Sequence, residues 1–567
     1  MHASRIKNLG LLVCLGFMFV CCISAQGAFA AEYRRISVAD YVDKMKGGWI
    51  GQMAGVGWGG PTEFRWKGEI IPEDKIPQWK PEMINQFGQD DIYVEMTFLR
   101  SLELYGMEVS IRQAGIDFAN SGYPLWHANN AGRSLLRSGI APPDSGHPEF
   151  NKHADDIDYQ IEADYAGLIA PGLPNVAIEL GEKFGRLMNY GDGLYGGQFV
   201  GGMYAEAFFE NDIVKIVQAG LKCIPKRSQY YECIADVLKW HRRNPDDWEK
   251  TWGLIEEKYQ DNHAYRRFSC GGPESDFNID AKINGAYIVM GLLYGEGDPD
   301  KTIIISTRCG QDSDCNPSNS GGVLFTTIGF EKLPDKFKSA LNPEGKFSHT
   351  PYNFPMLIEV NKKLVRQAVE RAGGRIEKSN GEEVFVIPVE EPKPSKLEQC
   401  WEPGPVANSR FTEQEMTQIT AVAGRDMAEA AEKFGGGWKI AKCGDDMNPG
   451  FYEDVHGRKN VLMTHPLNQT VGCVLSKEVE IPAGKKTKLS LIVGHHPEGD
   501  WTLIVKADGK ELFKTPVGKE TATELWTNVE VDLSQYAGKK TKLELVNEAS
   551  EWKFEAGYWA KIELVSQ

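Results

Sequence analysis

Residues 51–63 constrain the fold more than any other stretch, and they read Gly51-Gln52-Met53-Ala54-Gly55-Val56-Gly57-Trp58-Gly59-Gly60-Pro61-Thr62-Glu63. Glycine carries no Cβ, so these glycines bring the backbone close to either a packed helix or a ligand. Glu63 ends the stretch, where its carboxylate is free to point into a cleft. We therefore expect a glycine-rich helix that ends beside a candidate site.

A first acidic motif follows, and residues 87–91 read Phe87-Gly88-Gln89-Asp90-Asp91 directly before a helical pattern. Two adjacent carboxylates repel each other, and the dipole at a helix N-terminus relieves this repulsion in part. A bound divalent cation would relieve it far more. Ordinary capping of the helix by either aspartate is the alternative interpretation.

A second acidic motif lies much later, where residues 308–316 read Arg308-Cys309-Gly310-Gln311-Asp312-Ser313-Asp314-Cys315-Asn316. An Asp-x-Asp step lets two carboxylates face one cation from a turn, as metals that prefer oxygen ligands require. A solvated loop is the alternative. The two cysteines that bracket this motif either bridge or stay buried as free thiols, and the chain has no C-x-x-C pair that would indicate a zinc knuckle.

Helical patterning surrounds these motifs from residue 36 to about residue 372, because apolar residues recur at three- and four-residue spacing. The clearest examples are residues 92–104, 213–223, 230–240, 283–293 and 361–371. Residues 302–305 fit either a strand or a helix. We predict an all-α catalytic domain over residues 31–390.

The pattern changes after about residue 376. Residues 384–388 are strand-like, and residues 391–433 read as a linker that contains one more helical stretch. From residue 434 to the end, apolar residues alternate between turn signals such as Ala483-Gly484 and Asp508-Gly509. We predict an all-β sandwich over residues 434–567, of the jelly-roll, galactose-binding-like kind.

Taken in order, the glycine-rich helix with its glutamate, the G-x-D-D-x-x-x-x-M helix start and the late G-x-D-x-D loop form one combined pattern. This pattern resembles the ADP-ribosylglycohydrolase family over roughly residues 40–335. The resemblance implies an all-α fold, one or two Mg²⁺ ions in a cleft, and hydrolysis of the ribofuranosidic bond of an ADP-ribosyl group. The metal ligands that it implies are Glu63, Gln89, Asp90, Asp91, Asp312 and Asp314.

The resemblance also implies an acidic residue that activates water. The catalytic candidates are Glu63, Asp91, Glu162 and Asp164. Residues 126–133, 153–164 and 191–197 combine polar and aromatic side chains, which suits a sugar pocket. A solvated, capped helical surface is the alternative for these segments.

Three positions depart from the family pattern. Gln89 stands where the family has threonine before its Asp-Asp pair, Cys315 stands where threonine follows Asp-x-Asp, and Gln52 replaces an aspartate. A thiol is a poor Mg²⁺ ligand, whereas an amide oxygen is acceptable. The departures indicate that one metal site is altered, weakened or lost.

The first thirty residues indicate export. Arg5 and Lys7 precede the apolar run 9–23, and Ala28-Phe29-Ala30 reads as a cleavage site. We predict a signal peptide at residues 1–30 and a secreted or periplasmic protein. An uncleaved anchor or a lipoprotein is the alternative.

The chain of 567 residues carries a formal net charge of −16. This acidity argues against nucleic acid or an anionic membrane as a partner, because phosphates repel it. No apolar run after the signal peptide is long enough to span a bilayer.

The predicted sandwich contains five tryptophans, Trp438, Trp501, Trp526, Trp552 and Trp559. Aromatic faces stack on sugar rings, but tryptophans on strands more often belong to the core. Export and the sandwich together favour a secreted, metal-dependent hydrolase of a furanosidic bond in a glycan or glycoside. The alternatives are an ADP-ribosyl-protein or ADP-ribose glycohydrolase, and a non-catalytic sugar-binding protein on a degenerate hydrolase fold.

Overall fold

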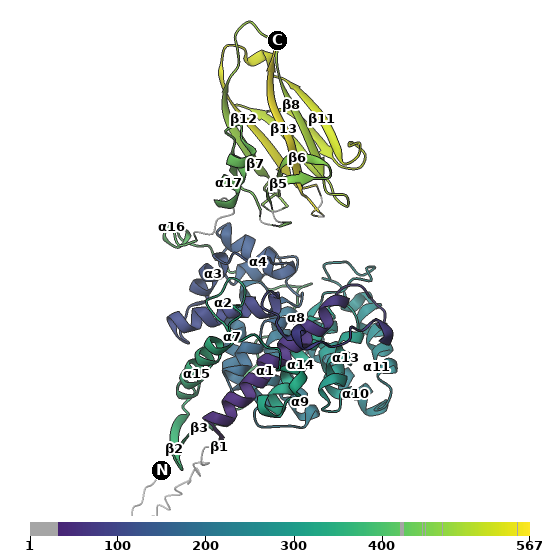
Figure 1. Cartoon of the computed structure of the whole chain (residues 1–567), viewed down its shortest axis with the longest axis vertical. Coiled ribbons are helices and arrows are strands. Elements are labelled where there is room, and N and C mark those ends of the chain that lie inside the picture. The colour runs from purple at the N-terminus through teal and green to yellow at the C-terminus, as the bar shows by residue number, and fades with distance from the viewer. Residues whose placement is uncertain are drawn as a thin grey trace, which may run out of the picture.

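Figure 1 shows the computed structural model of the chain, which describes residues 32–567 apart from 420–424, 445, 448, 468, 551 and 553. The signal peptide predicted at residues 1–30 lies outside the described residues. A helical body occupies the lower part of the picture, and an all-β body stands above it. Each body has its own hydrophobic core.

The first body confirms the prediction of a mostly helical domain. Its helices are α1 (Val38–Gly59), α2 (Asp90–Tyr105), α3 (Ile111–Ala119), α4 (His127–Arg137), α5 (Asp158–Ile161), α6 (Asp164–Leu168), α7 (Pro174–Phe184), α8 (Asp192–Ala207), α9 (Ile213–Lys222), α10 (Gln229–Arg243), α11 (Trp248–Ile255), α12 (Ala281–Tyr294), α13 (Pro299–Arg308), α14 (Cys315–Ile328) and α15 (Phe354–Arg371). Residues 302–305, which fitted either a strand or a helix, lie in α13.

Helix α1 packs directly on the backbone of α14 and of the loop before it. A stripe of glycines at four-residue spacing makes this contact. A Cβ on Gly51 would lie 2.3 Å from the carbonyl oxygen of Gly321, and one on Gly55 would lie 2.1 Å from that of Pro317. The glycines therefore serve helix packing rather than contact with a ligand.

The helical domain also contains a small antiparallel sheet, which the all-α prediction did not include. Its strands are β1 (Tyr33–Ser37), β2 (Arg375–Ser379) and β3 (Glu382–Pro388), in the order β1-β3-β2. Phe385 and Ile387 of β3 are buried and belong to the helical core. The strand-like residues 384–388 are therefore one strand of a sheet that α15 and α1 support.

Residues 389–419 follow the surface of the helical domain. Arg186 pairs with Glu398 at 2.8 Å, and Arg112 pairs with Glu415 of α16 (Glu413–Met416) at 2.5 Å. Helix α17 (Arg425–Phe434) then packs on the β body, where Met427 joins the core. Lys152 contacts this body by a hydrogen bond to Gln469 of 2.6 Å.

The second body confirms the predicted β-sandwich. Two five-stranded antiparallel sheets have the orders β10-β9-β12-β7-β4 and β11-β8-β13-β6-β5. Burial alternates along β8 and β11, as period-two patterning predicts. The strands are β4 (Lys439–Ala441), β5 (Gly450–Val455), β6 (Arg458–Thr464), β7 (Cys473–Glu480), β8 (Thr487–His495), β9 (Trp501–Ala507), β10 (Lys510–Val517), β11 (Trp526–Asp532), β12 (Lys540–Glu548) and β13 (Gly557–Ser566).

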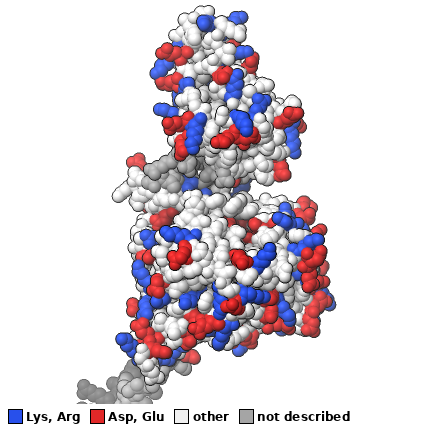
Figure 2. All heavy atoms as spheres, viewed as in Figure 1, with Lys and Arg blue, Asp and Glu red and all other residues white. Residues whose placement is uncertain are grey.

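Acidic and basic side chains intermingle over the face of both bodies that Figure 2 shows. Cys309 and Cys315 are both free and buried, so they do not bridge around the second acidic motif. Among the described residues, no helix is both long enough and apolar enough to cross a membrane.

Candidate functional site

Three segments bring the two acidic motifs together with Glu63. Glu63 follows the short 3-10 helix Gly60–Thr62 at the end of α1, and Asp90 and Asp91 open the first turn of α2. Asp312 and Asp314 lie in the loop between α13 and α14. We call these five carboxylates the acidic cluster.

Backbone contacts fix the Glu63 loop against the Asp312 loop. The Phe64 N–H donates to the Gln311 carbonyl at 3.0 Å, and the Gln311 N–H donates to the Trp66 carbonyl at 2.9 Å. The hydroxyls of Thr62 and Ser313 also bond at 2.8 Å. A Cβ on Gly59 would lie 2.0 Å from the Ser313 carbonyl oxygen, so glycine at this position is required for the close approach.

Two sets of possible ligand atoms meet at Asp314. One set joins Glu63, Asp312 and Asp314, and the other joins Asp91, Asp314 and Cys315, with the atoms of each set within 4.8 Å of one another. A carboxylate that two ligand sets share could contact two neighbouring cations.

Burial and mutual repulsion raise the pKa values across the cluster. Burial, followed by the charge of Asp314, raises the pKa of Asp90 to about 7. Partial removal from water and the charges of Asp314 and Asp90 raise the pKa of Glu63 to about 8. The pKa of Asp91 and that of Asp312 also rise well above the ordinary range, through burial and the charge of Asp314.

These features fit a divalent cation. Asp91 Oδ1 and Asp312 Oδ1 are buried and accept no hydrogen bond among the described residues. Buried carboxylate oxygens without donors are costly unless a cation or a proton satisfies them. A hard ion such as Mg²⁺ takes carboxylate oxygens of this kind.

The three residues that depart from the family pattern, Gln52, Gln89 and Cys315, have different neighbours. The Cys315 thiol donates to Asp91 Oδ2 at 3.2 Å, and burial raises its pKa, so it stays a neutral thiol. Gln52 Nε2 donates to Glu95 Oε1 at 2.5 Å, so a neutral amide lies where an aspartate would face Glu95. The amide nitrogen of Gln89 lies 3.8 Å from the position of a Cβ on Gly60, at the end of α1.

Glu162 and Asp164 are both buried but have different partners. Glu162 accepts a hydrogen bond from Asn129, and its Oε2 has no partner among the described residues. Burial, with the charges of Asp158, Asp90 and Asp91, raises its pKa, so Glu162 lies within electrostatic reach of the acidic cluster. Asp164 accepts from Tyr204 at one oxygen and from Asn319 Nδ2 at the other, at 2.7 Å. Those donors occupy both oxygens of Asp164.

Sequence reasoning missed one group beside this site. His127, His153, Asp156 and Cys270 bring four possible ligand atoms within 4.8 Å of one another. Three of them lie in the polar segments that we assigned to a sugar pocket. Only the spacing of His153 and Asp156 within one loop could have indicated the group, because its other members are distant in sequence.

Comparisons with known proteins bear mainly on the helical domain. A sequence model of the ADP-ribosylglycohydrolase family matches residues 37–373. No curated protein sequence matches the chain significantly.

Solved structures show weak similarity. A structure described as an ADP-ribosylglycohydrolase-related protein complex shares 14% identity, with 58% of this chain and 100% of that chain covered and a TM-score of 0.36. A structure of TmCBM61 in complex with β-1,4-galactotriose shares 19% identity over 23% of this chain and 90% of that chain, with a TM-score of 0.18. A cyclase from Fischerella sp. TAU shares 13% identity over 23% of this chain and 74% of that chain, with a TM-score of 0.17.

These TM-scores are low, so assignment to a family depends on the sequence match alone. That match spans more than half of the chain and includes all five carboxylates of the acidic cluster. The chain therefore belongs to the ADP-ribosylglycohydrolase family.

Proposed function

We propose that the helical domain hydrolyses a furanosidic bond in a glycan or glycoside, after export, with Mg²⁺ bound at the acidic cluster. The observation that carries this proposal is the meeting of two ligand sets at Asp314. Family membership supports hydrolysis of a glycosidic bond. The predicted signal peptide and the appended sandwich favour a glycan over an intracellular ADP-ribosylated protein.

The acidic cluster would hold Mg²⁺ through Asp91, Asp312 and Asp314, with Asp90 and Glu63 beside them. Bound there, the ion would bind sugar hydroxyls and stabilise negative charge that develops on oxygen. Gln89 lies at the start of α2 beside this set and offers an amide oxygen.

Glu63 suits proton transfer better than the other carboxylates because it is exposed. Its pKa of about 8 means that it can carry a proton at neutral pH while the cluster is unneutralised. Once the neighbouring charges are neutralised, Glu63 ionises and can take a proton from an attacking water. Glu162 lies deeper and would position the reacting sugar or stabilise positive charge on its ring.

The test is a panel of furanosides and plant or bacterial glycans, with Mg²⁺ or with EDTA. We expect release of reducing sugar that EDTA abolishes and Mg²⁺ restores. Asp91→Asn and Asp314→Asn should each lower kcat by at least about 100-fold. Asp74→Asn, which changes an exposed carboxylate that pairs with Lys75 and belongs to neither ligand set, is the matched control. Unchanged turnover in Asp314→Asn would refute the site.

A second function rests on the family match itself, which favours hydrolysis of ADP-ribosyl bonds. Release of ADP-ribose from a modified protein, without action on any glycan, would select this function. Saturable sugar binding without turnover on either class would instead select the non-catalytic interpretation.

The sandwich would bind glycan through exposed rings rather than through its core tryptophans. Trp501 and Trp559 are fully buried, and Trp438 and Trp526 are nearly so. Phe554 is 40% exposed and stacks on His496 at 4.5 Å between ring centroids. We expect Phe554→Ala to weaken binding to a polysaccharide while turnover of a small glycoside stays unchanged.

A further inference from the structure

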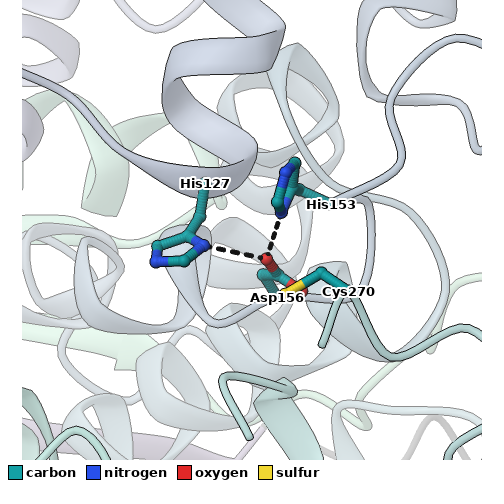
Figure 3. A group of neighbouring side chains, drawn as sticks. All are labelled: His127, His153, Asp156 and Cys270. Atoms are coloured by element: carbon teal, nitrogen blue, oxygen red, sulfur yellow. Dashed lines mark hydrogen bonds and ion pairs between the residues drawn. The ribbon is translucent and has the colours of Figure 1, made fainter. Parts of the chain in front are cut away.

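A second group of possible ligands lies beside the acidic cluster, and we call it the His–Cys cluster. Figure 3 shows its members, His127, His153, Asp156 and Cys270, directed toward a common centre. His127 opens α4, His153 and Asp156 lie in the loop before α5, and Cys270 lies in the loop before α12. The group thus joins three segments that are far apart in the sequence.

The donor set is chemically different from that of the acidic cluster. Two imidazole nitrogens, one thiol sulfur and one carboxylate oxygen form a mixed N/S/O set, which Zn²⁺ and related transition metals prefer and Mg²⁺ does not. Ligand atoms around a tetrahedral Zn²⁺ lie about 3.3–3.8 Å apart. His127 Nδ1 lies 3.4 Å from Asp156 Oδ2, and all four ligand atoms lie within 4.8 Å of one another.

The central carboxylate has unused bonding capacity. Asp156 is fully buried, and its Oδ2 bonds to His153 Nδ1 at 2.7 Å. Its Oδ1 accepts no hydrogen bond among the described residues. His127 has a positive φ of 43°, which is uncommon for a residue other than glycine and directs its ring into the group.

A neighbouring trio of carboxylates is a useful contrast. Asp155 and Asp280 approach Asp156, but the buried ammonium of Lys282 lies 3.1 Å from Asp280 and 3.7 Å from Asp155. A lysine of the chain therefore already supplies the positive charge for that trio. The His–Cys cluster shares Asp156 with that trio, but its other members are two imidazoles and a thiol.

We propose that His127, His153, Asp156 and Cys270 form a zinc-type metal site, separate from the Mg²⁺ site of the acidic cluster. A metal at this place would tie the loop that carries Cys270 to the start of α4. That loop also carries Phe277, which stacks on His127 and contacts Phe64, the neighbour of Glu63. The site would therefore brace the segment that carries Glu63 of the acidic cluster.

The test uses untagged full-length protein loaded with Co²⁺, which replaces Zn²⁺ and reports on coordination. We expect one equivalent of tightly bound metal, the visible bands of four-coordinate Co²⁺, and a thiolate-to-metal charge-transfer band. Cys270→Ser should abolish the charge-transfer band. His153→Ala should abolish the four-coordinate spectrum, and Zn²⁺ should displace the Co²⁺.

Cys315 is the matched control, because it is the thiol of the competing ligand set at the acidic cluster. Cys315→Ser should leave the charge-transfer band unchanged. If Cys315→Ser removes the band and Cys270→Ser does not, or if no band appears in folded protein, the proposal is wrong. Circular dichroism of each variant establishes that the fold is kept.

A second readout follows from the bracing role. Chelation of the bound metal should speed proteolysis within residues 266–280 at least several-fold, and Zn²⁺ should reverse this. The same treatment of His153→Ala should change nothing, because that variant has already lost the four-coordinate site. Equal protection with and without metal in the wild-type chain would overturn the bracing role.

Discussion

Two groups of carboxylates in the helical domain balance their negative charge in different ways. In the acidic cluster, the strongest charges that act on Asp91 and Asp312 come from other carboxylates. In the second group, the lysine-centred cluster of Asp155, Asp192, Asp280 and Lys282, three carboxylates act on one buried ammonium. The first group therefore takes its compensating charge from solution, as a cation or as protons, whereas the second has an ammonium built into the chain.

This difference helps to separate acidic residues that can bind a metal or catalyse a reaction from those that stabilise the fold. Asp192 lies in a Gly-rich segment that we considered for the sugar pocket, yet its oxygen accepts from the Tyr230 N–H at 3.2 Å and it faces Lys282. We infer from these contacts that Asp192 supports the fold beside Lys282. Both groups are rich in buried aspartate, and the position of the positive charge separates them.

The largest expected effect comes from removing the internal cation. We expect Lys282→Met to lower the free energy of unfolding by about 3–5 kcal/mol, because it leaves buried carboxylates without a partner. Urea unfolding measures this loss. Lys258→Met, which breaks a partly exposed pairing with Glu232 and Asp236, should cost less than about 1 kcal/mol. If the two substitutions lowered the free energy of unfolding equally, Lys282 would not be the essential internal cation that the comparison assumes.

The second predicted effect is that Mg²⁺ stabilises the folded protein to a degree that depends on pH. Glu63 and Asp90 have folded pKa values of about 8 and about 7, above those of the unfolded chain. Their protonation stabilises the metal-free fold fully below about pH 4, and this stabilisation is lost as pH rises through 7–8.

Mg²⁺ must displace those protons, so it should stabilise the protein more at pH 8.5 than at pH 6, by roughly 2–4 °C in Tm. Thermal unfolding in Mg²⁺ and in EDTA at both pH values gives the difference. Asp91→Asn should abolish most of the Mg²⁺ effect. A Mg²⁺ shift that is larger at pH 6 would contradict the assignment.

The third effect concerns the thiol at the acidic cluster. Cys315→Thr places a hydroxyl oxygen beside Asp91 and Asp314, and we expect Mg²⁺ to bind about tenfold more tightly, since oxygen is a better ligand than sulfur for this ion. Calorimetric titration measures the affinity. Cys315→Ala removes the thiol without adding an oxygen, so it should bring no gain.

The smallest predicted effect is a change in the free energy of unfolding that has opposite signs in the acidic cluster and in the lysine-centred cluster. In EDTA at pH 8, Asp312→Asn should stabilise the fold by on the order of 1 kcal/mol, because it removes a repelling charge. Asp280→Asn should destabilise it, because the buried Lys282 ammonium, 3.1 Å away, loses its nearest opposing charge. Chemical denaturation of both variants tests the signs, and matching signs would show that the two clusters do not differ in this way.

The sequence supported much of the fold. Three- and four-residue spacing predicted the helices, and alternation predicted the sandwich, because both periods are local properties of the chain. The pairing of β1 with β3 joins residues at opposite ends of the helical domain, so no local pattern could predict that sheet.

The candidate site was predictable where order along the chain carries information. The acidic motifs and Glu63 were recognisable as a series, and the fold brings them together. The His–Cys cluster was not predictable, because Cys270 and His127 share no motif and meet only through the packing of loops. Likewise, no sequence pattern indicates that Lys282 of α12 pairs with Asp155 and Asp280.

The glycine stripe of α1 has a consequence for tolerance to mutation. Gly55 packs against the start of α14 and Gly59 packs against the Asp312 loop, and neither position has room for a methyl group. A scan of all substitutions should therefore find these glycines as intolerant as the aspartates, although they have no side chain to offer. In homologues that retain the proposed hydrolysis, we expect the glycine stripe of α1 and the carboxylates of the acidic cluster to be conserved together.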